Sequence, residues 1–346
     1  MKHLLRAFLA AGAMAVAAGA TVAAAKTLDI YFIDVEGGQS TLIVTPAGES
    51  LLIDTGYPER DGRDPDRIMA AMRDAHVTSI DYLLVTHMHE DHNGGAAELS
   101  RRVPIRAFVD YGELMETSAD QVAAFAAYSA ARAHAEQAGT ARHIVPKPGD
   151  KLPLRDLDVD IVSADGETIS TPLSGAGAPN DACANLEPRG MGGENRRSIG
   201  VRIRYGAFRF VDLGDLVGPA MARLVCPDNL LGQADVYLIT HHANNESTTA
   251  VTLAALKPRV AIANNGAYKG GAPPTWTALH GHPEIAVWQL HKSLNYDSVN
   301  YPDEFIANPE FGANDRGAWI KASANGDGSF SVTNGRTGWS RPYGRN

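Results

Sequence analysis

The sequence predicts an α/β protein arranged as a four-layer αββα sandwich, in which two β-sheets pack together and helices cover their outer faces. Three observations support this prediction. Short apolar runs separated by Gly and Asp turns occur in both halves of the chain, helical patterns lie between them, and 44% of the 346 residues are hydrophobic. A chain of this length and composition is able to bury a large core.

The first half of the chain supplies the segments expected to form one sheet and its helices. Apolar runs bounded by turn residues predict strands at 27–35, 40–46, 50–56, 79–86, 105–110, 151–154 and 157–163. Helices are predicted at 64–76, at 93–101 and in the Ala-rich stretch near 117–138.

The second half repeats the same alternation of strands and helices. Strands are predicted at 198–205, 208–214, 235–240 and 259–265 and within 317–333, and helices at 217–226, 247–257 and 283–294. Residues 164–195 and 266–281 are predicted as loop insertions. Loops of this length in compact domains are usually binding loops, lids or disordered segments.

The first 25 residues have the pattern of a secretory signal peptide. Lys2 and Arg6 precede an apolar run, and Ala23-Ala24-Ala25 provides a small-residue cleavage site. We therefore expect a periplasmic or secreted protein whose single domain spans 26–346. The alternative is an N-terminal membrane anchor, although the run is Ala-rich and weakly hydrophobic for a spanning helix.

Charge and cysteine content narrow the possible partners. Cleavage after residue 25 changes the formal net charge from −9 to −11, because Lys2 and Arg6 are removed and no acidic residue is. An acidic protein has no general attraction for nucleic acid or for an anionic membrane, so neither is expected as a partner. Cys183 and Cys226 could form one disulfide in an oxidising compartment or remain two buried thiols. The oligomeric state does not follow from the sequence.

The densest group of possible metal ligands lies at 85–95, in the stretch VTHMHEDHNGG. His87, His89, Asp91 and His92 follow a buried strand directly, where irregular backbone can direct their side chains to one point. Imidazole nitrogen and carboxylate oxygen are preferred ligands of zinc and similar divalent ions. The stretch is too rich in ligand types for an ordinary solvated turn and predicts a metal site.

This stretch resembles the His-x-His-x-Asp-His signature of the metallo-β-lactamase-fold hydrolase superfamily. Four further stretches resemble its competence-protein branch, the exported hydrolase domains related to the DNA-uptake channel: FIDVEGGQSTLIVTPAGESLLIDTG, ENRRSIGVRIRYGAFRFVDLGDL, YLITHHANNES and HGHPE. The resemblance covers most of 27–300. It implies the metallo-β-lactamase fold and two divalent metal ions, most often zinc, with manganese as the alternative.

The resemblance also implies how the ligands divide between the two ions. His87 and His89 would bind the first ion, Asp91, His92 and His242 would bind the second, and Asp215 would bridge both. Adjacent side chains of an extended backbone point in opposite directions, so we expect only one of His241 and His242 to be a ligand. We favour His242 as the ligand and His241 as a catalytic group near the substrate, although the order could be reversed.

One departure from the superfamily pattern concerns the first ion. Many members supply a third histidine from the loop before the SIGVRIRY strand, but this chain has Asn195 there, and the competence-like branch also lacks that histidine. The first ion is then expected to be the more open, with substrate entering beside it. Asn195 could be a weak ligand or bind an anion, and Arg197 could clamp a phosphate or carboxylate.

Other residues are weaker candidates. Asp54 is expected to orient a ligand histidine or, alternatively, to cap backbone amides, and Asp34 has the same two alternatives. His282 is expected before a helix, where it could help to hold an anionic substrate. Tyr268, Lys269 and Trp276 are candidates for walls of the substrate pocket.

These residues predict metal-assisted hydrolysis, in which hydroxide formed from water between the ions attacks an ester and Asp91 accepts a hydrogen bond from the nucleophile. The competence-like motifs favour a phosphodiester, and the absence of a basic run favours a small-molecule or headgroup ester. The alternatives are a lactone or β-lactam hydrolase and a non-catalytic metal-binding protein. The sequence contains no nucleophile elbow, phosphate-binding loop or dinucleotide fingerprint.

Overall fold

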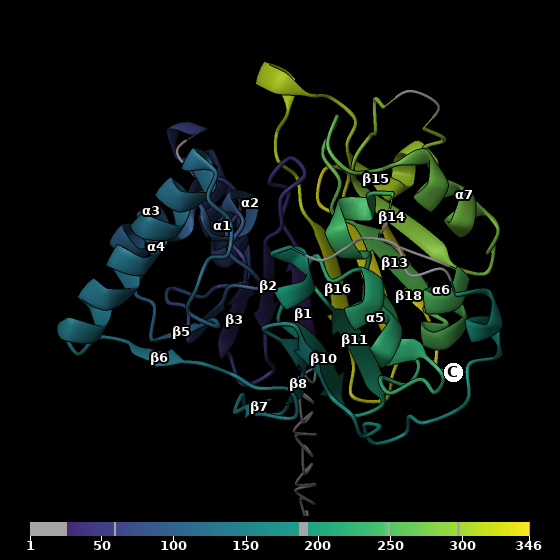
Figure 1. Cartoon of the computed structure of the whole chain (residues 1–346). Coiled ribbons are helices and arrows are strands. Elements are labelled where there is room, and N and C mark those ends of the chain that lie inside the picture. Colours follow the sequence, from purple (N-terminus) through teal and green to yellow (C-terminus); the bar gives the residue numbers. More distant parts are fainter. Residues whose placement is uncertain are drawn as a thin grey trace, which may run out of the picture.

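The computed structural model describes residues 26–58, 60–186, 193–245, 247, 250–295 and 298–345. Within them the chain forms two mixed β-sheets that pack face to face, with helices on both outer faces (Figure 1). The predicted αββα fold class is confirmed. The predicted signal peptide, residues 1–25, lies outside the described residues.

The first sheet has the strand order β18-β17-β16-β1-β2-β3-β4-β5-β6. Its strands are β1 (Leu28–Phe32), β2 (Thr41–Val44), β3 (Ser50–Ile53), β4 (Tyr82–Leu84), β5 (Ala107–Val109), β6 (Arg142–Ile144), β16 (Ile320–Ala324), β17 (Phe330–Asn334) and β18 (Ser340–Tyr343). Strands β3 to β6 are parallel to one another, and the other neighbours are antiparallel.

The second sheet has the order β15-β14-β13-β12-β11-β10-β8-β7, and β9 pairs with β8. Its strands are β7 (Lys151–Leu152), β8 (Asp158–Ala164), β9 (Glu167–Thr168), β10 (Gly200–Tyr205), β11 (Phe208–Asp212), β12 (Val236–Leu238), β13 (Val260–Ala263), β14 (Ala286–His291) and β15 (Ile306–Asn308). Strands β11 to β15 are parallel.

The helices form two outer layers, one on each sheet. The blue helices of Figure 1 lie on the first sheet: α1 (Arg63–Asp74), α2 (Glu90–Asn93), α3 (Ala96–Arg102) and α4 (Ala119–Gln137). The green helices lie on the second: α5 (Gly218–Val225), α6 (Ala250–Leu256) and α7 (Pro273–His280). Single 3₁₀ turns include η2 (Asp181–Asn185), η3 (Asn195–Arg197) and η4 (Thr240–Ala243).

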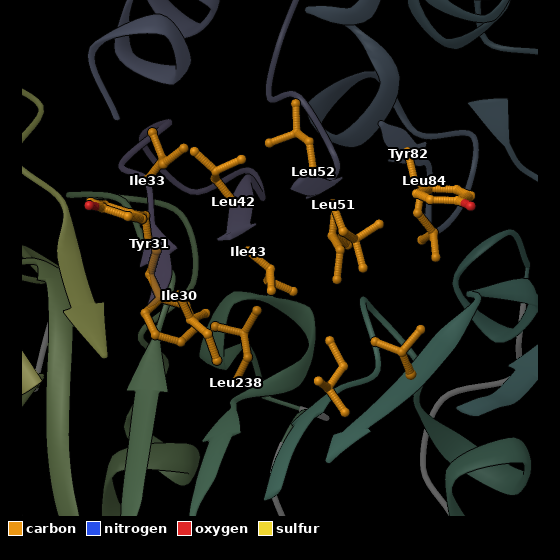
Figure 2. Packing of buried hydrophobic residues seen from close by; sticks show 14 of the residues in the cluster. Ile30, Tyr31, Ile33, Leu42, Ile43, Leu51, Leu52, Tyr82, Leu84 and Leu238 are labelled. Carbon is orange, nitrogen blue, oxygen red and sulfur yellow. The ribbon is translucent and has the colours of Figure 1, made fainter. Parts of the chain in front are cut away.

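The alternation of side chains along each strand divides the core into layers. Ile43 and Leu51 point from the first sheet toward the second, where Leu238 lies, whereas Leu42 and Leu52 point to the opposite side (Figure 2). All five side chains are buried. Because each buried aliphatic side chain contributes about 1.5–3 kcal/mol, these layers hold the strand ends firmly in place.

The structure corrects the prediction for 266–294. A helix, α7, lies inside the predicted loop 266–281, and the predicted helix 283–294 is wrong, because 286–291 form strand β14. Val287 of β14 packs under the helices, whereas Trp288 and Leu290 pack between the sheets. A strand buried on both faces has a continuous apolar sequence, which cannot be distinguished from a buried helix by periodicity.

The predicted helix at 93–101 corresponds to α3, and the unpredicted α2 precedes it across the Gly94-Gly95 pair. A Cβ atom added to Gly95 would lie 2.3 Å from the carbonyl oxygen of Thr55, so only glycine allows this close approach to the chain after β3. Strands β6, β15 and β18 were not predicted.

Two further structural findings concern the predicted export. Cys183 and Cys226 form a disulfide that ties the loop after β9 to the end of α5. In the described part of the chain no helix combines the length and apolar character that a membrane crossing requires.

Candidate metal centre

The candidate site lies at the carboxyl ends of neighbouring strands from both sheets. Asp54 follows β3, and His87 lies beyond the end of β4 in the first sheet. Asp215 lies beyond the end of β11, and η4 with its two histidines follows β12 in the second. Since carboxyl ends of parallel strands meet at one edge, the packed sheets bring these distant segments together.

Two groups of ligand atoms converge at this edge. The first group consists of His87, His89 and Asp215, and the second of Asp91, His92, Asp215 and His242. Within each group one ligand atom of each residue lies within 4.8 Å of the others. Asp215 belongs to both groups, because its Oδ2 lies 3.8 Å from Nε2 of His87 and 3.2 Å from Nε2 of His242.

The donor atoms fit a pair of divalent metal ions. Nε2 of His87 lies 2.9 Å from Nδ1 of His89, and Nε2 of His92 lies 3.3 Å from Nε2 of His242. Lone pairs this close repel each other unless a positive charge lies beside them. A mixed set of imidazole nitrogens and carboxylate oxygens is suited to zinc or manganese.

Asp54 and Thr86 orient one histidine of each group. Nδ1 of His92 lies 2.7 Å from Oδ2 of Asp54, and the carboxylate also accepts from the Thr86 hydroxyl at 2.7 Å. The same hydroxyl lies 3.1 Å from Nδ1 of His87. A carboxylate can only accept, so Nδ1 of His92 carries the proton that Asp54 accepts. The Thr86 hydroxyl donates its own hydrogen to Asp54, so its oxygen accepts from Nδ1 of His87. Both Nε2 atoms are then free for a metal ion. This is the arrangement expected of Asp54.

Sequence reasoning missed a partner of His89. Nε2 of His89 lies 3.2 Å from a carboxylate oxygen of Glu116, in the loop before α4. That contact places the proton on Nε2 and leaves Nδ1 facing His87. No spacing rule joins Glu116 to the cluster, since the path of this loop depends on tertiary packing.

The two adjacent histidines of η4 do not point in opposite directions. His241, His242 and Ala243 have φ values of 51°, 55° and 60°, so the backbone is left-handed rather than extended. Both Nε2 atoms therefore face Asp215, at 3.9 Å for His241 and 3.2 Å for His242. His242 is fully buried and also lies 3.1 Å from Asp91, whereas the His241 side chain is 20% exposed. The structure thus brings both histidines to the site, but only His242 belongs to one of the two ligand groups.

Asn195 and Arg197 have different positions, although both belong to η3. Nδ2 of Asn195 lies 3.2 Å from Nε2 of His241, so Asn195 contacts the histidine that faces the shared carboxylate of Asp215. Arg197 does not face the site. Its guanidinium binds Asp165 at 2.6 Å and lies over the ring of Tyr111, so the predicted anion clamp at Arg197 is wrong.

His282 is also remote from the ligand groups. It follows the end of α7 rather than preceding a helix, and its ring binds Glu284 at 2.9 Å near the surface. A second Gly-x-Pro stretch, 271–273, does precede a helix, α7. Its middle residue is Ala272, which has no polar side chain to contact a substrate. The predicted substrate contact at His282 is therefore corrected.

The remaining weak candidates divide between core and site. Asp34 binds Arg67 and His291, at 2.8 Å and 3.0 Å, in a separate buried ion cluster. Trp276 is buried in the core beneath the helices of the second sheet. Tyr268 is 64% exposed, and Lys269 reaches the site.

Opposite charges govern ionisation in the site. Burial raises the pKa of Asp91 and of Asp215, but the neighbouring imidazoles outweigh burial and hold each pKa well below its usual value. Burial lowers the pKa of His87 well below the ordinary value. Burial also acts on His92, where the surrounding carboxylates prevail and raise the pKa well above it. A divalent cation that binds here would therefore displace a proton from His92.

Comparison with protein families places the first half of this site in a known group. Residues 33–179 match the family model described as the metallo-beta-lactamase superfamily. The matched range contains Asp54 and the cluster from His87 to His92. The sequence of residues 33–179 is thus similar to this superfamily, and the match covers less than half of the chain. No curated protein sequence matches the chain significantly.

Several solved structures are similar in fold. The metallo-beta-lactamase fold protein YhfI from Bacillus subtilis is 10% identical, with a TM-score of 0.45, over 76% of this chain and 96% of that one. A HARLDQ-motif metallo-beta-lactamase from Cronobacter sakazakii is 14% identical, with a TM-score of 0.37, over 62% and 75%. CmlA, a diiron beta-hydroxylase from Streptomyces venezuelae, is 13% identical, with a TM-score of 0.39, over 75% and 49%. At identities of 10–14% and TM-scores below 0.5, these similarities support no conclusion about the reaction.

Proposed function

We propose that this protein is an exported hydrolase of the competence-protein-like branch that uses two divalent metal ions, zinc or manganese, to cleave a phosphodiester. The observation that carries the proposal is the position of Asp215. Its Oδ2 lies 3.8 Å from His87 and 3.2 Å from His242, so one carboxylate serves both ligand groups. A protein that only bound one structural ion would not need a shared carboxylate between two groups.

Each ligand group has a defined role in this mechanism. His87, His89 and Asp215 would hold the first ion, and Asp91, His92, Asp215 and His242 would hold the second. Bound ions would acidify a water molecule and neutralise charge that develops on the phosphoryl group. Asp91 and Asp215 remain ionised because their pKa values are lowered, so either can accept a hydrogen bond from the attacking water.

His241 is the side chain best placed to contact substrate directly. It is 20% exposed, whereas the ligand histidine beside it is fully buried, and it lies 3.2 Å from Asn195. Burial lowers the pKa of His241, so the neutral ring predominates near neutral pH. His241 faces Asp215, the carboxylate shared by both ligand groups, and Asn195 contacts His241. Substrate is proposed to enter beside these two residues, toward the first ligand group.

The competence-like sequence motifs favour a phosphodiester over a lactone or β-lactam. The Gly-His-Pro motif at His282 no longer counts among them, because His282 does not reach the site. The formal charge of −11 expected after cleavage disfavours long DNA, so a small or headgroup diester is preferred. Export is supported by the signal-like N-terminus and by the Cys183–Cys226 disulfide, since such bonds persist in oxidising compartments.

The test compares three substrates on zinc-loaded and manganese-loaded protein. We expect turnover of bis-p-nitrophenyl phosphate, with Asp215→Ala reducing it to background and the exposed-surface control Glu136→Ala leaving it unchanged. Turnover of only a lactone or of nitrocefin would refute the phosphodiester. Turnover that survives in Asp215→Ala would refute the proposed site.

A further inference from the structure

Lys269 lies against the second ligand group, and the metal-based mechanism above gives it no role. Its ammonium binds Oδ2 of Asp91 and donates to the hydroxyl of Tyr57 at 3.0 Å. It also lies 5.2 Å from the centre of the Tyr57 ring. An ammonium has three donor hydrogens, and these contacts use two of them. The side chain is 37% exposed, and neither contact uses the third donor of the ammonium.

The backbone holds Lys269 rigidly in this position. Gly37, in the turn after β1, has φ +90°, and a Cβ atom added to it would lie 2.8 Å from Cβ of Lys269. The amide of Gly266 donates to the carbonyl of Lys269 at 2.9 Å, and the amide of Gly271 donates to the carbonyl of His242 at 3.0 Å. The loop that carries the lysine is therefore fastened to the turn that carries a metal ligand.

The predicted alternatives for binding a negative charge are engaged elsewhere. Arg197 is paired with Asp165, and His282 is bound to Glu284. Arg63 and Arg67, near the same turn after β1, are paired with carboxylates at 2.6 Å and 2.8 Å. Among the described residues, Lys269 is the only lysine or arginine that forms an ion pair with Asp91 or Asp215, the carboxylates of the two ligand groups.

We propose that Lys269 and Tyr57 form an anion-binding subsite beside the second ligand group, which selects substrates that carry a negative charge next to the bond to be cleaved. The proposal rests on the proposed function, because every phosphodiester keeps one ionised phosphoryl oxygen near neutral pH. The subsite would separate these anionic substrates from neutral phosphotriesters and lactones. The ionised oxygen would accept the free donor of Lys269. A charge-assisted hydrogen bond in a partly buried site is strong enough to discriminate against neutral esters.

The test measures binding of inorganic phosphate to zinc-loaded protein by isothermal titration calorimetry. Lys269→Met should weaken binding about ten- to hundredfold, as expected for loss of one hydrogen bond to a charged group. Lys269→Arg should retain most of the affinity because it keeps the charge. The control is Lys257→Met, which removes an exposed lysine after α6, and it should bind phosphate like the wild type.

A second pair of variants tests the placement of the lysine without removing it. Gly37→Ala should displace Lys269 and weaken phosphate binding. Gly48→Ala is the matched control, since Gly48 has a similar φ of +83° but nothing within 4 Å of an added Cβ. Equal phosphate affinity in Gly37→Ala and Gly48→Ala would count against the subsite.

The outcomes separate this inference from the proposed function. Phosphate binding that depends on Lys269, without turnover of bis-p-nitrophenyl phosphate, would support the subsite and refute the phosphodiesterase. Turnover with unchanged phosphate affinity in Lys269→Met would overturn the subsite alone. If Lys269→Met instead lost zinc while its loaded fraction bound phosphate normally, Lys269 would serve only to position Asp91, and the inference would be wrong.

Discussion

Asp54 and His92, which are 38 positions apart in the chain, are joined by a contact of 2.7 Å between Oδ2 and Nδ1. Both side chains are fully buried. Through Thr86 the same carboxylate is connected to His87, so one acidic residue orients a histidine in each ligand group. Asp54 therefore acts on both ligand groups from the Nδ1 side of the two rings, away from their Nε2 atoms.

Asp54→Asn should weaken zinc binding about tenfold to hundredfold, because the amide lacks the charge that supports the imidazole protons. The measurement is a competition titration against a chromophoric chelator. The conservative change preserves side-chain size, so the far-ultraviolet circular dichroism should be unchanged. Zinc affinity equal to the wild type would show that Asp54 merely caps the turn after β3.

His241 and His242 should differ in their effect on metal content. His242→Ala should reduce zinc to about one ion per chain, because the second ligand group loses a fully buried nitrogen. His241→Ala should keep both ions and lower turnover. Elemental analysis of the two purified variants decides between them. Loss of an ion from His241→Ala, with His242→Ala fully loaded, would reverse the assignment.

The stability of the protein should depend on pH through His291. Burial disfavours the charged ring, but Asp34 and Asp315 outweigh burial and raise the pKa of His291 to about 9. Since the folded pKa exceeds the unfolded value of about 6.5, the stabilisation is complete below pH ~6.5 and is lost as pH rises through about 9. It amounts to about 3 kcal/mol at most.

Urea unfolding of metal-free protein at a series of pH values measures this effect. The wild type should lose stability between pH ~6.5 and ~9, and His291→Gln should show a flatter profile across that range. Parallel profiles for the two proteins would exclude His291 as the titrating group.

Reduction of the Cys183–Cys226 bond should lower the free energy of unfolding by about 2–4 kcal/mol. The bond joins residues 43 positions apart, so it restricts the conformations of the unfolded chain, and reduction removes this restriction. The measurement is chemical unfolding with and without reductant. The double variant Cys183→Ser/Cys226→Ser should be insensitive to reductant. An equal response in both proteins would mean that the effect lies elsewhere.

Local sequence patterns predict most of the strands and the first four candidate ligands, which the structure brings together. The run before His87 has the composition of a buried strand, and the dense cluster of candidate ligands follows it directly. One short stretch therefore predicts both a strand and a metal site at its end. Asp215 was reached only through its resemblance to a family motif, since a Gly-Asp pair alone indicates an ordinary turn.

The unpredicted features depend on tertiary structure. The left-handed backbone at His241 and His242 violates the usual preference of residues with a Cβ, and the surrounding structure holds it in place. The contacts of Glu116 and Lys269 come from loops, whose paths no periodicity encodes. Strand β14 was mistaken for a helix because both of its faces are buried.

The central claim is that two ligand groups share Asp215 and hold two ions. Elemental analysis of the protein after reconstitution with zinc or manganese and removal of free metal tests it most directly. The account predicts close to two ions per chain, in agreement with the two groups. One ion per chain or fewer would contradict it.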